Sequence, residues 1–248
     1  HGREHSFPTR RSSDLLYLAL AAEDPANQVV QSGLAKAWNN LSNGLLDAGD
    51  SQGALDAGRE AVTILRSQWS ADPTNVDLEN SLGGALHGIA IAMKNLGDRK
   101  GAKELLLEAI AHQEAVLKRA PNYTFAIQFR CNHYVKLAEV VRLDGDYVGA
   151  LEVAQKMVDT APNDGLQWRR LAAEHVAASK LAADDPALTP EARTERADQY
   201  VRKALELLAT ALDLGYSDRD YLETSEAFAP VRDLPEFQAL VDRLPRKS

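Results

Sequence analysis

The sequence has a single cysteine and few residues that interrupt helices. With Cys131 alone, no disulfide can form within the chain, and a sequence of this kind is typical of a reducing compartment. We therefore expect a cytoplasmic protein. Only 15 glycines and 10 prolines occur among the 248 residues. Long stretches are thus free of helix breakers, which favours an all-α fold.

Long hydrophobic runs and an excess of positive charge are also missing. The longest apolar candidate, residues 15–22, ends at Glu23 and is shorter than the roughly 18 residues that a membrane-spanning helix needs. The formal net charge is −8, which disfavours binding to the phosphate backbone of a nucleic acid. We therefore expect neither a membrane nor a nucleic acid as a partner.

The sequence also lacks the motifs of catalysis and of metal or cofactor binding. No glycine-rich phosphate loop follows a strand pattern, and the catalytic His-Arg-Asp and Asp-Phe-Gly motifs of protein kinases are absent. Cys131-x-His133 is the one Cys/His cluster, and zinc needs about four ligands. We expect Cys131 to be a buried thiol beside a surface histidine, and no catalysis, metal or cofactor in this stretch. Three other histidines have no cysteine or further histidine near them in the sequence: His87, His112 and His175.

The first fifteen residues do not share the pattern of the rest. They resemble the conceptual translation of a short-read sequencing adapter, whose codons give the run from His5 to Asp14 followed by a leucine. We interpret residues 1–15 as a non-native, disordered segment and exclude them from fold reasoning. On this interpretation the natural N-terminus, with any signal or domain that it carries, lies outside the sequence.

From about Leu16 onward, two markers recur with one period of 48 residues. A Gly-Asp pair follows an apolar helical pattern every 48 residues, and prolines recur at the same spacing. Glycine can adopt the left-handed conformation that ends a helix, and aspartate can cap the next helix. We therefore predict a unit of helix, tight turn, helix and proline stop. The markers are Gly49-Asp50, Gly97-Asp98 and Gly145-Asp146, with Pro25, Pro73 and Pro121.

Within each unit the apolar residues are spaced as on one face of a helix. The first helices carry large residues at i, i+3, i+7 and i+10, and the second helices carry alanines that allow close helix packing. The predicted core positions of the first helices are Trp38, Leu41, Leu45 and Ala48, then Leu86, Ile89, Met93 and Leu96, then Tyr134, Leu137 and Val141. Those of the second helices include Ala54, Ala61, Ala102, Ala109 and Ala150.

These positions resemble the tetratricopeptide repeat (TPR). Trp38-x-x-Leu41-Ser42-x-x-Leu45 is similar to the first helix of that repeat, and Ala54 and Ala61 match the two alanines of its second helix. Trp168-x-x-Leu171-Ala172 opens a fourth copy. The resemblance implies a right-handed α-α superhelix of about four helical hairpins plus a C-terminal helical cap. Since the period is longer than is usual in the family, we expect extended helices.

The markers also predict the organisation of the chain. We expect the repeat array to span residues 16–214 and to be followed by capping helices over residues 215–248. Its predicted units are residues 16–24 (partial), 28–72, 76–120, 123–161 and 165–214.

The tail has a resemblance of its own. Gly215-Tyr216, Asp218 to Leu222, Pro230-Val231-Arg232 and Pro235-Glu236-Phe237 resemble the end of bacterial serine/threonine protein kinases that carry TPR units after the kinase domain. The resemblance implies that this stretch is a regulatory or substrate-recruiting arm of a kinase whose catalytic domain is not included. We expect the tail itself to form a cap over the last repeat.

The resemblance implies a function in protein binding. First helices of TPR arrays line a concave groove that holds a peptide or helix of a partner protein. Asn39 and Asn43, four residues apart on one helix face, could hydrogen-bond an extended peptide backbone. The candidate groove residues are Lys36, Asn39, Asn43, His87, Lys94, Glu139, Arg142 and Arg169. Three alternatives remain open: a peptide- or helix-binding scaffold, a kinase arm, and a scaffold that associates with its own copies.

Overall fold

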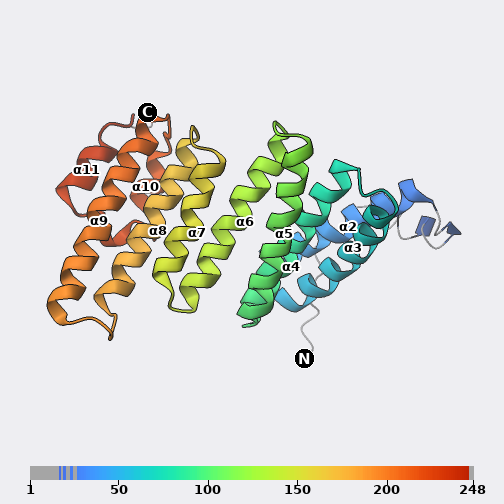
Figure 1. Ribbon diagram of the computed structural model, residues 1–248, viewed down its shortest axis with the longest axis horizontal. Helices are drawn as coiled ribbons and strands as arrows, with labels where there is room; N and C mark the ends of the chain where they lie inside the picture. Colours follow the sequence, from blue (N-terminus) through green and yellow to red (C-terminus); the bar gives the residue numbers. More distant parts are fainter. Residues whose placement is uncertain (1–16, 18, 21–22, 25–26, 246–248) are drawn as a thin grey trace, which may run out of the picture. The chain divides into compact units, whose positions relative to one another are not determined.

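The computed structural model describes residues 17, 19–20, 23–24 and 27–245, and the regular elements of these residues are helices (Figure 1). The expected disordered segment 1–15 and most of the expected partial unit 16–24 lie outside the described residues. The chain divides into two compact units. The first ends at His133 and the second begins at Tyr134, so the division falls within α6 (Thr124–Leu143).

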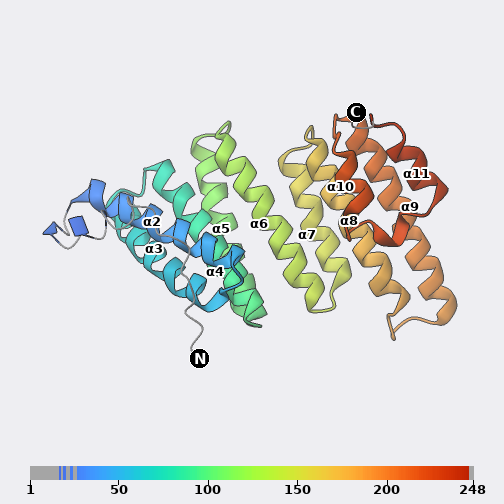
Figure 2. The ribbon, with the colours of Figure 1, turned by 180° about the vertical axis from the view of Figure 1, so that it is seen from behind.

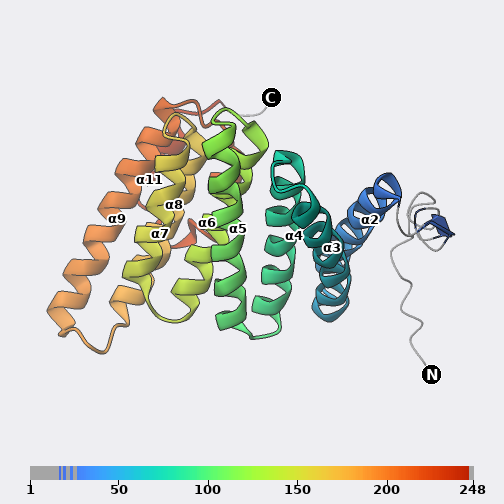
Figure 3. The ribbon, with the colours of Figure 1, turned by 45° about the vertical axis from the view of Figure 1, so that its right-hand side comes forward.

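In the first unit two helical hairpins follow one another. Helices α2 (Gln28–Asp47) and α3 (Ser51–Ala71) form one hairpin, and α4 (Val76–Asn95) and α5 (Arg99–Arg119) form the next. Helix α3 also packs against α4, which joins the hairpins. Figure 3 shows α4 and α5 running side by side. The hairpins bury a shared core that neither could bury alone.

The second unit continues the helical pattern. After α6 come α7 (Tyr147–Thr160), α8 (Gly165–Ala183) and α9 (Pro190–Asp213). Helix α8 packs against both α7 and α9. Three short elements close the chain: α10 (Arg219–Thr224), the 3-10 turn η1 (Ala229–Val231) and α11 (Pro235–Val241). The expected fold class is therefore confirmed: an all-α, TPR-like succession of helical hairpins with a C-terminal helical cap.

The Gly-Asp corners have the conformation that the sequence predicted. Gly49, Gly97 and Gly145 have φ angles of 81°, 92° and 87°, in the left-handed region where a side chain is disfavoured. The aspartate that follows each glycine accepts a hydrogen bond from a main-chain N–H of the next helix. These bonds measure 2.9 Å at Asp50, 2.8 Å at Asp98 and 2.8 Å at Asp146. The three corners are thus equivalent in successive hairpins.

The predicted core faces are largely buried. The five alanines predicted for the second helices are completely buried, which lets neighbouring helices approach closely. The predicted positions Ala48 and Leu96 were wrong, because each is the C-terminal cap residue at a corner and is exposed. Gln113 stands where the preceding repeat has Leu65. It too is buried, and its amide donates to the main-chain oxygen of Asn80 at 3.2 Å.

The C-terminal cap has a small aromatic core of its own. Phe228 and Phe237 are buried, and their ring centroids lie 5.6 Å apart. Helix α11 packs against α9 and α10 (Figure 2). Pro235 occupies the first turn of α11, where its missing N–H leaves no helical hydrogen bond unmade. The tail therefore forms the helical cap that the sequence predicted.

Candidate functional site

A cavity of about 530 Å³ lies within the first unit. Its walls come mainly from α2, α4 and the N-terminal half of α6, which are the first helices of successive units, with two residues from α3. This volume is within the range of cavities that bind ligands. The lining residues are Ser32, Ala35, Lys36, Asn39, Asn43, Leu65, Gln68, Asn75, Asp77, Leu78, Asn80, Ser81, Gly84, His87, Phe129, Asn132 and His133.

Helix α2 contributes a polar wall. Ser32, Lys36, Asn39 and Asn43 recur at i, i+4, i+7 and i+11, so they share one face of the helix. The start of α2 is fixed by Asn27, whose side chain accepts from the main-chain N–H groups of the first turn. Lys36 and Asn43 are exposed and Asn39 is half-buried. Their side chains can therefore reach a bound segment.

Helix α4 contributes the neighbouring wall, and its start is fixed in the same way. The Asn75 side chain accepts from the N–H groups of Asp77 and Leu78, both at 3.1 Å. From this cap the lining residues follow the helix as far as His87. The turn Pro73-Thr74-Asn75 thus has a role beyond the proline stop that the sequence predicted, because its asparagine starts the helix that bears the wall.

Helix α6 contributes an aromatic wall. Phe129 and His133 are four residues apart on one face of the helix, and their ring centroids lie 6.3 Å apart. The Phe129 ring lies close to Gly84 of α4. A Cβ at Gly84 would lie 3.2 Å from that ring. The absence of a side chain there lets the two walls approach each other.

Two histidines meet at the cavity. The Nδ1 atoms of His87 and His133 lie 3.0 Å apart, within hydrogen-bond distance, and the ring centroids are 4.8 Å apart. Burial is the main cause that lowers the pKa of His133 to about 2, and the charge that a protonated His87 would carry adds to this shift. His133 is therefore neutral at physiological pH, so one ring nitrogen donates and the other accepts.

This pair corrects two expectations. His133 was expected at the surface, but it is only 1% exposed because α6 turns it toward α4. His87 was considered isolated, but its partner lies 46 residues away in the sequence. Cys131 is a buried thiol, as predicted. Among the described residues, no group of three or more His, Cys, Asp or Glu side chains could hold a metal ion.

The charged groups of the cavity are few. Lys36 and Asp77 are the charged side chains among the described lining residues, and they have opposite signs. The Tyr123 hydroxyl donates to the Asp77 carboxylate at 2.5 Å. This bond is the main cause that raises the pKa of Tyr123 to about 12, with burial and the charge of Asp77 adding to it. The Asp77 carboxylate is thus already engaged.

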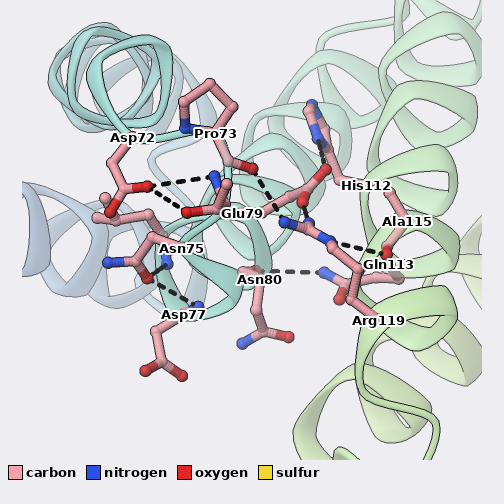
Figure 4. Close-up of polar contacts among 12 residues, drawn as sticks. Asp72, Pro73, Asn75, Asp77, Glu79, Asn80, His112, Gln113, Ala115 and Arg119 are labelled. Carbon is pink, nitrogen blue, oxygen red and sulfur yellow. Dashed lines mark hydrogen bonds and ion pairs between the residues drawn. The ribbon is translucent and has the colours of Figure 1, made fainter.

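A buried ion pair lies next to the cavity, on the side of α4 that faces α5 (Figure 4). Glu79 is 3% exposed and forms an ion pair with Arg119, and its carboxylate lies 3.3 Å from the Nδ1 of His112. Arg119 also donates to the main-chain oxygen of Pro73 at 2.9 Å. Burial is the main cause that lowers the pKa of His112. The cluster ties the proline turn to the end of α5.

Four of the eight sequence-predicted groove residues line the cavity. They are Lys36, Asn39, Asn43 and His87. Lys94 is half-buried on α4 and is not among the lining residues.

Two further predicted residues, Glu139 and Arg142, belong to the second unit and form ion pairs there. Lys136 donates to Glu139 at 2.8 Å, and Arg142 donates to Glu174 at 2.7 Å. Burial raises the pKa of Glu174, and the Arg142 guanidinium opposes that shift.

Arg169, the last predicted groove residue, has a different environment. It is 9% exposed, and its guanidinium lies over the Tyr216 and Tyr221 rings, 5.6 Å and 4.2 Å from their centroids. It also donates to the Tyr221 hydroxyl at 3.0 Å. These contacts join α8 to the C-terminal cap.

Several lining residues were not foreseen from the sequence, namely Gln68, Asn80, Phe129, Asn132 and His133. Asn80 could have been found, since it lies one helical turn before Gly84 on the face that continues to His87. Gln68 could not, because it comes from a second helix and reaches the cavity beside the start of α2.

The arrangement can bind but shows no catalytic constellation among the described lining residues. They include no cysteine, and their one carboxylate, Asp77, accepts from Tyr123. Of the two serines, Ser32 accepts from Gln68, and Ser81 donates to the main-chain oxygen of Asp77. Neutral amides and hydroxyls dominate, and these groups can donate hydrogen bonds to a ligand and accept them from it. None of the helices in the described part of the chain has the length and apolar character of a membrane span.

No protein-family model matches the sequence, and no curated protein matches it. Among solved structures, the chain is similar to BtubC (BKLC) from P. vanneervenii. The TM-score is 0.50 at 17% sequence identity, over 95% of this chain and 92% of that chain. It also matches a crystal structure of MamA, with a TM-score of 0.44 at 18% identity over 79% of this chain and 87% of that one. At such identity, the likeness to BtubC concerns the fold alone.

Proposed function

We propose that the chain is a protein-interaction scaffold that binds an extended peptide segment of a partner protein in the cavity of the first unit. The observation that carries this proposal is the row of neutral polar side chains on α2 and α4, with Asn39 and Asn43 four residues apart on one face. An extended peptide presents alternating N–H and C=O groups, and each needs a partner when it is removed from water.

Asparagine suits this task because its side chain carries both a donor and an acceptor. Two asparagines one turn apart are neighbours on the helix surface, so they can contact successive peptide groups. The aromatic wall at Phe129 offers apolar area to a side chain of the same segment. A helical partner fits less well, since its main-chain groups are already paired within the helix.

The test is selection of binders from a displayed library of random peptides, using the full chain as the target. The double variant Asn39→Ala, Asn43→Ala removes both side-chain amides. We expect selected peptides to bind it at least about tenfold more weakly, since two hydrogen bonds of about 1 kcal/mol each are lost. The matched control is Asn95→Ala, an exposed asparagine of α4 that does not line the cavity.

The proposal fails if no peptide is enriched, or if the enriched peptides bind the double variant as tightly as they bind the Asn95→Ala control. Circular dichroism of the variants checks that the helices are intact.

Two other hypotheses stay predictions from the sequence. The kinase-arm hypothesis rests on the resemblance of the tail, and none of the comparisons supports it. Reading the gene upstream of Leu16 tests it, because an open frame without kinase motifs would remove it. Association of two copies is tested by sedimentation of the chain at micromolar concentration, where a single monomeric species would exclude it.

A further inference from the structure

The cavity is polar but nearly uncharged. Among its described lining residues, Lys36 and Asp77 carry formal charges at neutral pH, and the carboxylate of Asp77 already accepts from Tyr123. Lys36 is exposed. The other polar side chains are the amides, hydroxyls and imidazoles of Ser32, Asn39, Asn43, Gln68, Asn75, Asn80, Ser81, His87, Asn132 and His133. A charge inside the cavity would therefore find little to compensate it.

Three buried side chains of this wall have polar atoms without a hydrogen-bond partner among the described residues. They are Gln68 Oε1, Asn80 Oδ1 and His133 Nε2, on side chains that are 6%, 7% and 1% exposed. Buried polar atoms are rarely left unpaired, because each costs about 1–3 kcal/mol. Unpaired buried atoms around one cavity therefore point to a ligand that pairs with them.

The hydrogen bonds of the Gln68 amide fix which of its two polar atoms lacks a partner. Gln68 Nε2 donates to Ser32 Oγ at 2.9 Å and lies within hydrogen-bond distance of two oxygens of Gln28. The remaining atom, Oε1, is therefore an acceptor that lacks a donor. In Figure 4 the Asn80 side chain points away from the Glu79 cluster. A ligand that satisfies Gln68 must offer an N–H or O–H group.

The lining residues also indicate how long a bound peptide segment can be. Along α2 they run from Ser32 to Asn43, and along α4 from Asp77 to His87. At 1.5 Å per helical residue, each row is roughly 15 Å long. An extended chain advances about 3.3 Å per residue, so about five residues span the row.

From these observations we propose that the cavity selects an uncharged segment of about five extended residues, rich in hydrogen-bond donors, and rejects charged side chains of either sign. This inference rests on the proposed function and specifies the chemical class of its ligand. Main-chain N–H groups and the side chains of Asn, Gln, Ser or Thr supply the donors. Lys and Arg would lose their hydration without gaining a free counter-ion, because the Asp77 carboxylate already accepts from Tyr123. Asp and Glu would meet only Lys36, whose exposure to water makes an ion pair with it weak.

The test uses the peptides selected on the full chain. We expect their central five positions to be depleted in Asp, Glu, Lys and Arg. In the tightest peptide, replacement of the central residue by Lys and by Glu, in separate peptides, should each weaken binding by about tenfold or more. Raising sodium chloride from roughly 50 to 500 mM should change the dissociation constant by less than about twofold, since screening acts on charges.

The inference is overturned if the selected peptides share a charge of one sign, if one of the two charged replacements improves binding, or if added salt weakens binding about tenfold. In each of these cases the Asn39→Ala, Asn43→Ala variant still binds more weakly than the control, so peptide binding itself stands. Equal binding by that variant would instead remove the proposed function.

Discussion

The guanidinium of Arg169 lies 4.2 Å from the centroid of the Tyr221 ring and donates to its hydroxyl. Arg169 belongs to α8 and Tyr221 to α10, so this contact joins the last repeat to the cap. A second ring, that of Tyr216, lies on the same guanidinium. The cap is therefore held by the contact of a buried cation with two aromatic rings as well as by its apolar core.

Replacing Arg169 by alanine should loosen the cap. We expect the free energy of unfolding of the second unit to fall by about 2 kcal/mol, because a cation–π contact and a hydrogen bond to a charged group are lost together. Hydrogen exchange over residues 216–244 measures the loosening, and urea unfolding measures the stability. The control is Arg202→Ala, at an exposed position of α9. If Arg169→Ala leaves exchange unchanged, the cap does not depend on this contact.

The corners of the hairpins were predictable because their chemistry is local. Gly49 and Asp50 end one helix and start the next through their own conformation and side chain, whatever the rest of the chain does. The lining role of Asn39 and Asn43 was predictable for a similar reason, since the helical period and the neighbouring core residues fix which face they occupy.

Other features depend on packing between distant segments and could not be predicted. The contact between His87 and His133 requires knowledge of how α4 meets α6. The burial of Arg169 depends on where the cap folds back, and spacing along α8 does not contain that information. The sequence thus predicted which residues share a helix face, while tertiary contacts decide which of them reach a common cavity.

Two glycines of the first hairpin should respond to alanine in opposite directions. Neither Gly44 nor Gly49 has an atom within 4 Å of the position that a Cβ would take, so only the backbone matters. Gly49→Ala places a side chain at a φ of 81° and should destabilise the protein by about 1–2 kcal/mol. Gly44→Ala lies inside α2 and should stabilise it by about 0.5–1 kcal/mol.

Thermal unfolding of both variants beside the unaltered protein measures this difference. Because the substitution is the same and the space is open in each case, each variant is the control for the other. Equal shifts in the midpoint would mean that the left-handed corner contributes nothing to the hairpin.

Acid should destabilise the first unit through His133. Its pKa is about 2 in the folded protein and 6.5 in an unfolded chain, so between these values the unfolded state holds one more proton. Stability is complete above pH 6.5 and should fall by about 1.4 kcal/mol for each pH unit below it. His133→Gln removes the titrating group, so its unfolding free energy should fall less steeply between pH 6.5 and about 5.

Urea unfolding at a series of pH values measures both slopes, and the difference between the two proteins isolates this histidine from the carboxylates. At pH 8 the proton contributes nothing, which makes that pH the reference for any loss of packing. If the unfolding free energies of the two proteins changed equally with pH, His133 would not be shielded from protonation.

Replacing Asn80 by leucine should weaken peptide binding without weakening the fold. The side-chain oxygen of Asn80 is buried without a partner, so exchanging the amide for an apolar group of similar size removes an unfavourable burial. The free energy of unfolding should stay the same or rise by up to about 1 kcal/mol. Binding of a selected peptide, measured by calorimetry, should weaken about tenfold, because the ligand loses an acceptor.

The matched control is Gln113→Leu, which exchanges another buried amide outside the cavity and introduces the residue found at the equivalent place of the preceding repeat. Gln113 Oε1 is also buried without a partner, but Gln113 Nε2 donates to the Asn80 main-chain oxygen. Loss of that bond should lower stability by about 1 kcal/mol, while peptide affinity stays unchanged because Gln113 does not line the cavity. The two variants thus separate a polar group that serves the fold from one that serves the ligand. If Asn80→Leu lowers stability as Gln113→Leu does and keeps full affinity, Asn80 has no part in binding.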